Sequence, residues 1–240
     1  MYKPSVFAHR GASGRYFENT MSAFMEAFSQ GAHGIELDVQ LTEDGVPVVI
    51  HDLDLTRVAG VHKQVSSMTY AEIKKIRIGR KYLRIVCGHR IPSLYEVASF
   101  CEVKEMGLNV ELKETVSERP AFLEEIISII SGLKNVHISS FHYHLLEKVK
   151  EVNPEIETAF LVRKKGVDWD NLELYTSADS FHLSKRLFTE PYVTKLRLTQ
   201  KMIRIYGVMG NEKYVIDPPA FIDGWITDYP ENLIIKKKRS

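Results

Sequence analysis

Two short stretches of this chain place carboxylates in patterns that alternate with apolar residues. Residues 34–40 read GIELDVQ and carry Glu36 and Asp38, and residues 109–115 read NVELKET and carry Glu111. Such alternation indicates β-strands that turn their polar groups to one face. A carboxylate set without cysteine is what hard cations prefer, so these three acids would suit Mg²⁺ or Ca²⁺ better than Zn²⁺.

Two histidines each end an apolar run that is typical of a strand. His9 follows VFA, and His51 follows PVVI. A pair of imidazoles suits acid–base work on a phosphate ester, because one takes a proton from an attacking hydroxyl while the other protonates the leaving oxygen. Arg10 adds a planar fork of donors for phosphate oxygens. Lys113, two residues after Glu111, is either a surface charge or a neutralising or anion-binding group.

Taken alone, GIELDVQ has a simpler interpretation, a half-buried strand with its acids in water. The predicted strands and helices around this stretch decide between the solvent-facing and the cation-binding interpretation. Strand-like runs alternate with helical patterns along the chain, at residues 6–8, 34–40, 108–111, 136–139, 157–161, 180–183, 202–206 and 224–227. Eight βα units in 240 residues predict an α/β fold, a (β/α)8 TIM barrel. A doubly wound open sheet is the alternative, but HRGASG lacks the glycine spacing of a dinucleotide-binding turn.

The barrel reverses which face of the second strand is inside. In a barrel the outer face of each strand packs against helices and the inner face points to the centre. Ile35, Leu37 and Val39 would then meet the helices, and Glu36 and Asp38 would point inward. Buried carboxylates are costly unless a cation or a proton compensates them, so the barrel favours the ligand interpretation.

Helix signals fill the connections between the strands. We expect Asn19 to cap a helix that ends at Gly31, Pro120 to open one that runs to Gly132, and Pro230 to open the last.

One connection is too long for a βα loop. Residues 46–50 follow the turn EDG and predict a hairpin return from the second strand. Residues 53–92 then predict a small insertion after the second strand, at the end of the barrel where such enzymes bind their substrates. No repeat or linker interrupts the chain, so residues 1–240 are expected to form a single domain.

The composition of the chain limits the kinds of binding partner and the cellular location that we expect. There are 32 Lys and Arg against 31 Asp and Glu, a net charge of +1 that gives no support to nucleic-acid binding. The chain has no apolar run of membrane-spanning length, so stable membrane insertion is not expected. The short apolar stretch at the N-terminus is no signal peptide, and Cys87 and Cys101 make no disulfide framework, which together indicate the cytoplasm. The basic residues 236–239 are expected to be a solvated terminus rather than a binding patch.

Several motifs together resemble the signature of the glycerophosphodiester phosphodiesterase family. The matching residues are His9-Arg10-Gly11, Glu18-Asn19-Thr20, Glu36 with Asp38, His51-Asp52, Ile91-Pro92-Ser93-Leu94, Glu111-Leu112-Lys113, Ile138-Ser139-Ser140-Phe141, Asp223-Gly224 and Thr227-Asp228-Tyr229-Pro230. They span nearly the whole chain, and their combination is far more specific than any single motif.

The resemblance implies a role for each matching residue. In similar proteins two histidines form the catalytic acid–base pair, three carboxylates hold one Mg²⁺ or Ca²⁺, and two basic residues contact phosphate. The matching residues are His9 and His51 for the pair, Glu36, Asp38 and Glu111 for the cation, and Arg10 and Lys113 for phosphate. The implied reaction is hydrolysis of a small-molecule glycerophosphodiester to sn-glycerol 3-phosphate and an alcohol such as choline or ethanolamine.

The chain departs from the family at the end of the seventh barrel strand. Many relatives have Trp-Thr-x-Asn there, whereas residues 206–209 read YGVM. Tyr206 keeps an aromatic group in the expected pocket wall, and the following GNEKYVIDPPAF is too broken for a full helix. Glu18 is expected either in the site or beside the helix cap. His142, His144 and His182 match no motif and are expected on a helix surface or in the core.

Two other functions stay open at the level of sequence. One is a lysophospholipase D-type activity, for which Tyr82, Leu83, Ile85 and Val86 offer an apolar track. The other is a silent barrel that binds glycerophosphodiesters without turnover. Loss of a metal carboxylate or of either histidine would favour the silent barrel, but all five residues are present.

Overall fold

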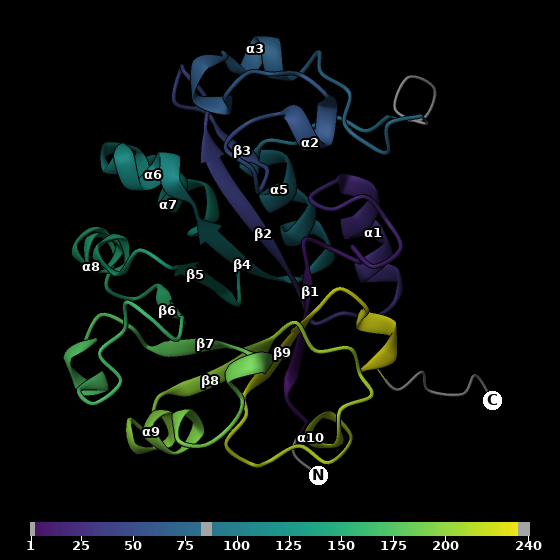
Figure 1. The fold of residues 1–240 in the computed structure, drawn as a ribbon. Coiled ribbons are helices and arrows are strands. Elements are labelled where there is room, and N and C mark those ends of the chain that lie inside the picture. The colour runs from purple at the N-terminus through teal and green to yellow at the C-terminus, as the bar shows by residue number, and fades with distance from the viewer. Residues whose placement is uncertain (1–2, 83–87, 235–240) are drawn as a thin grey trace.

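A closed barrel of parallel strands surrounded by helices forms the body of the computed structural model, which describes residues 3–82 and 88–234 (Figure 1). The barrel strands are β1 (Ser5–His9), β2 (Gly34–Leu41), β4 (Gly107–Leu112), β5 (Val136–Ser140), β6 (Glu157–Val162), β7 (Ser180–Ser184), β8 (Met202–Tyr206) and β9 (Gly224–Thr227). Each pairs in parallel with its neighbour, and β1 closes the barrel by pairing with both β2 and β9. The expected TIM barrel is confirmed.

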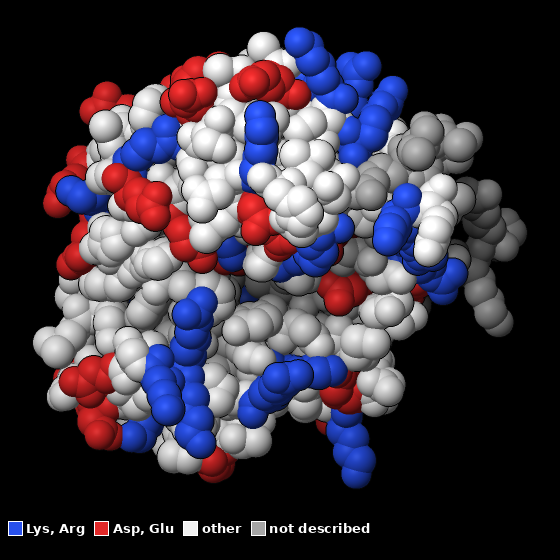
Figure 2. Space-filling model, turned by 45° about the horizontal axis from the view of Figure 1, so that its top comes forward, with Lys and Arg blue, Asp and Glu red and all other residues white. Residues whose placement is uncertain are grey.

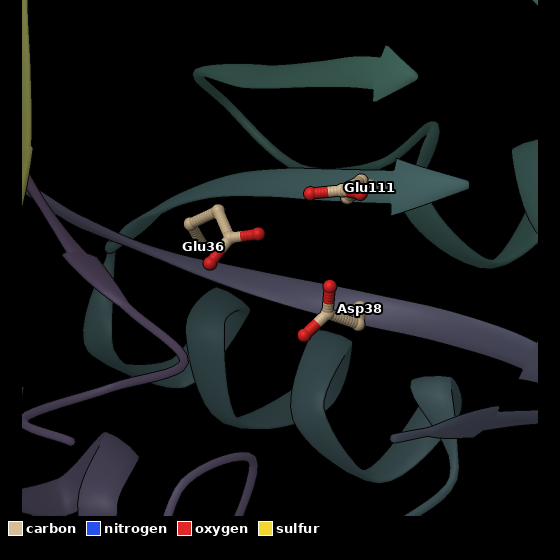
Figure 3. A group of neighbouring side chains, drawn as sticks. All are labelled: Glu36, Asp38 and Glu111. Atoms are coloured by element: carbon tan, nitrogen blue, oxygen red, sulfur yellow. The ribbon is translucent and has the colours of Figure 1, made fainter. Parts of the chain in front are cut away.

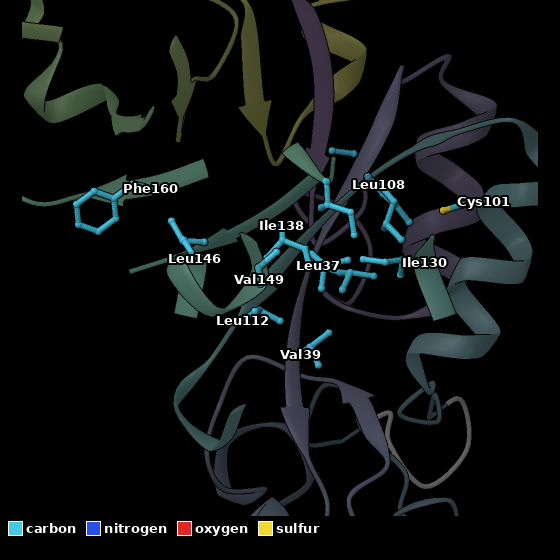
Figure 4. Packing of buried hydrophobic residues seen from close by; sticks show 14 of the residues in the cluster. Leu37, Val39, Cys101, Leu108, Leu112, Ile130, Ile138, Leu146, Val149 and Phe160 are labelled. Atoms are coloured by element: carbon cyan, nitrogen blue, oxygen red, sulfur yellow. The ribbon is translucent and has the colours of Figure 1, made fainter. Parts of the chain in front are cut away.

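Helices cover the outside of this barrel. The longer ones are α1 (Met21–Ser29), α5 (Leu94–Lys104), α7 (Leu123–Ile130), α8 (Tyr143–Val152) and α9 (Tyr192–Leu198), and the shorter ones are α2 (Thr56–Ala59), α3 (Tyr70–Ile73), α6 (Glu114–Glu118) and α10 (Lys213–Ile216). Outward side chains such as Leu37, Leu108 and Ile138 are fully buried in one apolar cluster with Leu146 and Val149 of α8 (Figure 4). The main apolar core therefore includes a layer between strands and helices, which leaves inward positions free for polar groups.

The first helix begins one residue later than expected. Thr20 is its N-cap, and its side chain accepts from the backbone N–H of Ala23. The prediction that Asn19 is the cap was wrong, because the Asn19 side chain is used elsewhere. Its Nδ2 donates to Oδ2 of Asp38 at 2.8 Å, and its backbone takes the left-handed conformation (φ 55°), which asparagine tolerates better than most residues.

The two proline signals gave different outcomes. Pro120 opens a 3₁₀ turn, Pro120–Phe122, that continues directly into α7. Pro230 opens only a 3₁₀ turn, Pro230–Asn232, so a full last helix is not formed there.

The hairpin return and the insertion are both present. Strand β3 (Pro47–Val49) pairs antiparallel with β2, and α2 and α3 follow it over the end of the barrel (Figure 1). The insertion has an apolar cluster of its own, made of Val48, Ile50, Leu55, Val58, Val65, Met68, Ile73, Ile78 and Ile91. Of the expected apolar track, Tyr82 is exposed, whereas Leu83, Ile85 and Val86 lie outside the described residues, as do Cys87 and residues 236–239. No helix among the described residues is long and apolar enough to cross a membrane.

Below the mouth, the inside of the barrel carries several buried polar groups. Arg204 is buried, pairs with Glu157, and donates from Nη1 to Ser180 Oγ at 3.1 Å. The rings of His137 and His182 lie edge to face, 5.4 Å between centres, and both are buried. Burial, aided by the positive charge of Arg204, lowers the pKa of both histidines well below the usual value. They are therefore neutral in the folded protein at neutral pH.

Acid is expected to weaken the fold through these two rings. In the unfolded chain each histidine binds a proton below about pH 6.5, whereas the folded protein does not, so the free energy of unfolding falls as the pH drops below that value. His137→Phe should make the loss between pH 7 and pH 5 smaller by about 1–2 kcal/mol, measured by urea denaturation. His62→Gln, at an exposed position, is the control. An equal pH dependence in wild type and His137→Phe would contradict this account.

Candidate active site

The three acids singled out in the sequence come together inside the barrel. Strands β2 and β4 pair so that Asp38 lies beside Glu111 and Glu36 beside Asn109. One carboxylate oxygen from each of the three acids lies within 4.8 Å of the other two, and Figure 3 shows the groups turned toward one another. All three side chains are buried. The expectation that the acids point inward is met.

Two basic side chains partly balance these acids. Arg10 Nε lies 2.9 Å from Asp38 Oδ2, and Lys113 Nζ lies 2.8 Å from Glu111 Oε1 and 3.6 Å from Asp38 Oδ1. Burial pushes the pKa of Asp38 up, but the charges of Arg10 and Lys113 outweigh it and hold that pKa below the usual value. Burial raises the pKa of Glu36, and the charges of Asp38 and Glu111 raise it further, against the opposing charge of His9.

This arrangement fits a divalent cation. Asp38 Oδ1 is buried and has no hydrogen-bond partner among the described residues, although Lys113 lies nearby. The raised pKa of Glu36 means that its charged form is costly in this site, and a bound cation would offset that cost. An all-oxygen set without cysteine suits Mg²⁺ or Ca²⁺. The residues that could hold the ion are Glu36, Asp38 and Glu111.

Each of the two histidines is held by an aspartate. His9 Nδ1 lies 2.6 Å from Asp228 Oδ1, and His51 Nδ1 lies 2.9 Å from Asp52 Oδ1. The other ring nitrogen of His9, Nε2, lies 3.9 Å from Glu36 Oε2. Burial lowers the pKa of His9, but Glu36 and Asp228 outweigh burial and raise that pKa to about 9. A carboxylate on Nδ1 fixes the orientation of an imidazole and leaves Nε2 for proton transfer.

The histidines and acids face one open cavity of about 250 Å³. Its lining includes most of the predicted site residues: His9, Arg10, Glu36, His51, Glu111, Lys113 and Tyr206. Asp38 is fully buried beside them. Of residues 206–209, only Tyr206 lies in the cavity wall, which agrees with its expected position, whereas the departing residues 207–209 are not part of the lining. The segment after them forms only the four-residue helix α10.

The deep end of the cavity carries polar atoms that lack partners. Asn109, Ser139 and His182 line it, and each is almost wholly buried. Asn109 Oδ1, Ser139 Oγ and both ring nitrogens of His182 have no hydrogen bond to any described residue. Buried polar atoms of this kind are normally satisfied by water or a ligand. His142 and His144 lie instead at the start of α8, outside the cavity lining.

Glu18 is not part of the cavity lining, but it binds two arginines next to the site. It accepts from Arg10 Nη1 at 3.0 Å and from Arg57 Nη2 at 2.8 Å, and Arg57 also binds Asp52. These contacts join the first βα loop to the insertion and hold Asp52 next to His51.

Several residues that support the site were named in the sequence motifs without a role in the site, and Arg57 was not named at all. Asp228 follows the last barrel strand, at the same end as the other site residues, which was a usable signal. Asp52 is adjacent to His51, a second signal. Asn19 was assigned to a helix cap, and nothing local marked Arg57 as a partner of Glu18.

A cluster of buried acids and two aspartate-held histidines, His9 after barrel strand β1 and His51 after the return strand β3, face one cavity, and they define an enzyme of the TIM-barrel class. The sequence pattern of the Glycerophosphoryl diester phosphodiesterase family matches residues 9–232. The chain belongs to this family, which confirms the resemblance.

Individual relatives agree over almost their whole length. The glycerophosphodiester phosphodiesterase of Caldanaerobacter subterraneus subsp. tengcongensis is 36% identical over 235 residues, 97% of each chain. The solved structure of an Oleispira antarctica phosphodiesterase in complex with the product sn-glycerol-3-phosphate has a TM-score of 0.84 and 25% identity, covering 96% of this chain and 95% of that one. The glycerophosphodiester phosphodiesterase of Thermotoga maritima has a TM-score of 0.78 and 30% identity, covering 96% and 97%.

A divalent cation is expected to stabilise the fold through the three acids. At a concentration 100 times its Kd, Mg²⁺ or Ca²⁺ should raise the free energy of unfolding by about 2.7 kcal/mol, seen as a higher Tm. Asp38→Asn should remove most of the shift, whereas Glu151→Gln on the exposed face of α8 should keep it. A Tm shift of equal size in Asp38→Asn and wild type would show that the ion binds elsewhere.

Proposed function

We propose that this protein hydrolyses glycerophosphodiesters to sn-glycerol 3-phosphate and an alcohol, with His9 and His51 as the acid–base pair. The observation that carries the proposal is that both imidazoles, each held at Nδ1 by an aspartate, line the cavity that also holds the acid cluster. The enzyme class expected from the sequence, a glycerophosphodiester phosphodiesterase, is confirmed by the family and the relatives.

The two histidines divide the proton transfers. In the first step the glycerol 2-hydroxyl attacks phosphorus, its proton passes to Nε2 of one ring, and the leaving alcohol oxygen takes a proton from Nε2 of the other. The new bond joins O2 to phosphorus and the bond to the alcohol breaks, which leaves a cyclic phosphate. In the second step the two imidazoles exchange roles. A water gives its proton to the imidazole that lost one in the first step and attacks phosphorus, the bond between phosphorus and O2 breaks, and O2 takes a proton from the other imidazole, which yields sn-glycerol 3-phosphate. Asp228 and Asp52 keep both rings oriented throughout.

Glu36, Asp38 and Glu111 are proposed to hold one Mg²⁺ or Ca²⁺. Such an ion lowers the pKa of a hydroxyl and offsets charge on phosphate oxygens. Arg10 and Lys113 direct their donors at carboxylates in this structure. With the carboxylates bound to the ion, both side chains would turn these donors to the phosphate.

The polar deep end of the cavity is proposed to take the glycerol hydroxyls. Asn109 Oδ1, Ser139 Oγ and the His182 ring offer unpartnered acceptors and donors there. Hydroxyl groups of the substrate would satisfy them, and the site would discriminate against substrates without those hydroxyls.

The proposal also includes a small-molecule substrate and a cytoplasmic location. The buried free thiol of Cys101 is compatible with that location.

His9→Ala is expected to abolish turnover without unfolding the protein, because His9 lies at the cavity mouth and contributes little to the apolar core. The measurement is a coupled assay of glycerol 3-phosphate release from a panel of glycerophosphodiesters, together with an assay of alcohol release from lysophospholipids, with Mg²⁺, Ca²⁺ or chelator. We expect a loss of at least about 10³-fold in kcat, with the exposed His62→Ala as the control.

Four results would contradict the proposal. Near wild-type turnover by His9→Ala would remove His9 from the mechanism, and full activity in chelator would remove the cation. Release of the alcohol from lysophospholipids but not from glycerophosphodiesters would favour the lysophospholipase D-type activity. Substrate binding without turnover would favour the silent barrel.

A further inference from the structure

Basic residues gather on one margin of the cavity mouth, in the loops that follow β6 and β7. They are Arg163, Lys164, Lys165, Lys185 and Arg186. Figure 2 shows Lys and Arg side chains projecting from the lower half of the face that carries the central hollow. Lys185 is paired with Glu212 at 3.0 Å, whereas the other four have no ion pair with any acid in the described part of the chain.

One of these side chains contacts the cavity wall, and another lies on the loop beside it. The guanidinium carbon of Arg163 lies 3.8 Å from the centre of the Phe141 ring, and Phe141 lines the cavity. Tyr206, which also lines the cavity, pairs with Ser184 at the end of β7, and Arg186 follows Ser184 by two residues. Arg163 is therefore packed against a wall that a substrate would touch, and Arg186 lies on the loop next to that wall.

On the opposite side of the mouth, Glu18 and Asp52 are bound by Arg10 and Arg57, so these two negative and two positive groups balance. The insertion on that side also carries exposed basic residues of its own, among them Lys63, Lys75 and Arg77. The loops after β6 and β7 differ in that their basic residues lie beside the cavity wall formed by Phe141 and Tyr206.

The polar deep end determines which part of a diester meets this margin. If the glycerol hydroxyls occupy the end lined by Asn109, Ser139 and His182, the alcohol group on the far side of the phosphate extends toward the mouth. It then passes the wall that carries Arg163 and Arg186.

We infer that Arg163 and Arg186 select diesters whose alcohol group is neutral or anionic and disfavour those of cationic amino alcohols. This inference rests on the proposed function and adds a substrate class to it. Choline and ethanolamine, the alcohols implied by the family resemblance, are cations and would meet like charges at this wall. A polyol, and above all a phosphorylated polyol, would meet complementary charges instead.

The test compares three diesters that differ in the charge of the alcohol: glycerophosphocholine, glycerophosphoinositol and glycerophosphoinositol 4-phosphate. The measurement is kcat/KM for glycerol 3-phosphate release at low ionic strength and saturating divalent cation. In wild type we expect kcat/KM for glycerophosphoinositol 4-phosphate to exceed kcat/KM for glycerophosphocholine by about tenfold or more. In the double variant R163Q/R186Q that ratio should fall about tenfold, and added salt should reduce the wild-type ratio in the same way.

A matched control removes two charges far from the mouth. Lys134 and Lys148 are both exposed, and K134Q/K148Q should keep the wild-type ratio. Circular dichroism checks that each variant is folded. A ratio equal in wild type and R163Q/R186Q, or a wild-type preference for the choline diester, would overturn the inference while leaving the proposed function intact. Failure of wild type to hydrolyse any of the three diesters would instead overturn the proposed function, and the inference with it.

Discussion

The rest of the site depends on one constraint, which is that three buried carboxylates lie within 4.8 Å of one another. The first βα loop contacts two of these carboxylates directly. Arg10 has a left-handed backbone (φ 54°), and its N–H donates to Glu36 Oε2 at 3.0 Å while its side chain reaches Asp38. Gly11 follows at φ 80°, where a Cβ would lie 2.6 Å from the backbone of Ala23 in α1, so only glycine fits this turn. The strained backbone at Arg10 and Gly11 is therefore the conformation that brings Arg10 against the acids.

The barrel separates the site from the apolar core. Strand residues of one parity pack outward against helices, and those of the other parity form an interior in which polar groups, from the acids down to Arg204, lie beside apolar side chains such as Phe7 and Leu161. Side chains at the mouth therefore contribute chemistry and little apolar burial. The same division explains why the inner surface can carry polar atoms such as Ser139 Oγ and the His182 nitrogens without a protein partner.

The elements and the inward acids could be predicted because both follow from short-range periodicity. Alternation with a period of two identifies a strand, and closure of a barrel decides which parity is inside, so Glu36 and Asp38 were assigned together. The supporting contacts could not be predicted in the same way. Asn19 has the residue type of a helix cap, and only the fold shows that its amide binds Asp38 instead. Asp228 is 219 residues from His9 in the chain, and the two meet only because β1 and β9 close the barrel.

The central claim is that Glu36, Asp38 and Glu111 form a single cation site beside the two histidines. Anomalous X-ray diffraction from crystals grown with Mn²⁺, a substitute for Mg²⁺, would test it most directly. The account predicts one strong anomalous peak within about 2.0–2.6 Å of an oxygen from each of the three carboxylates. A crystal saturated with the ion that shows no peak between these carboxylates, or shows its peak elsewhere, would contradict it.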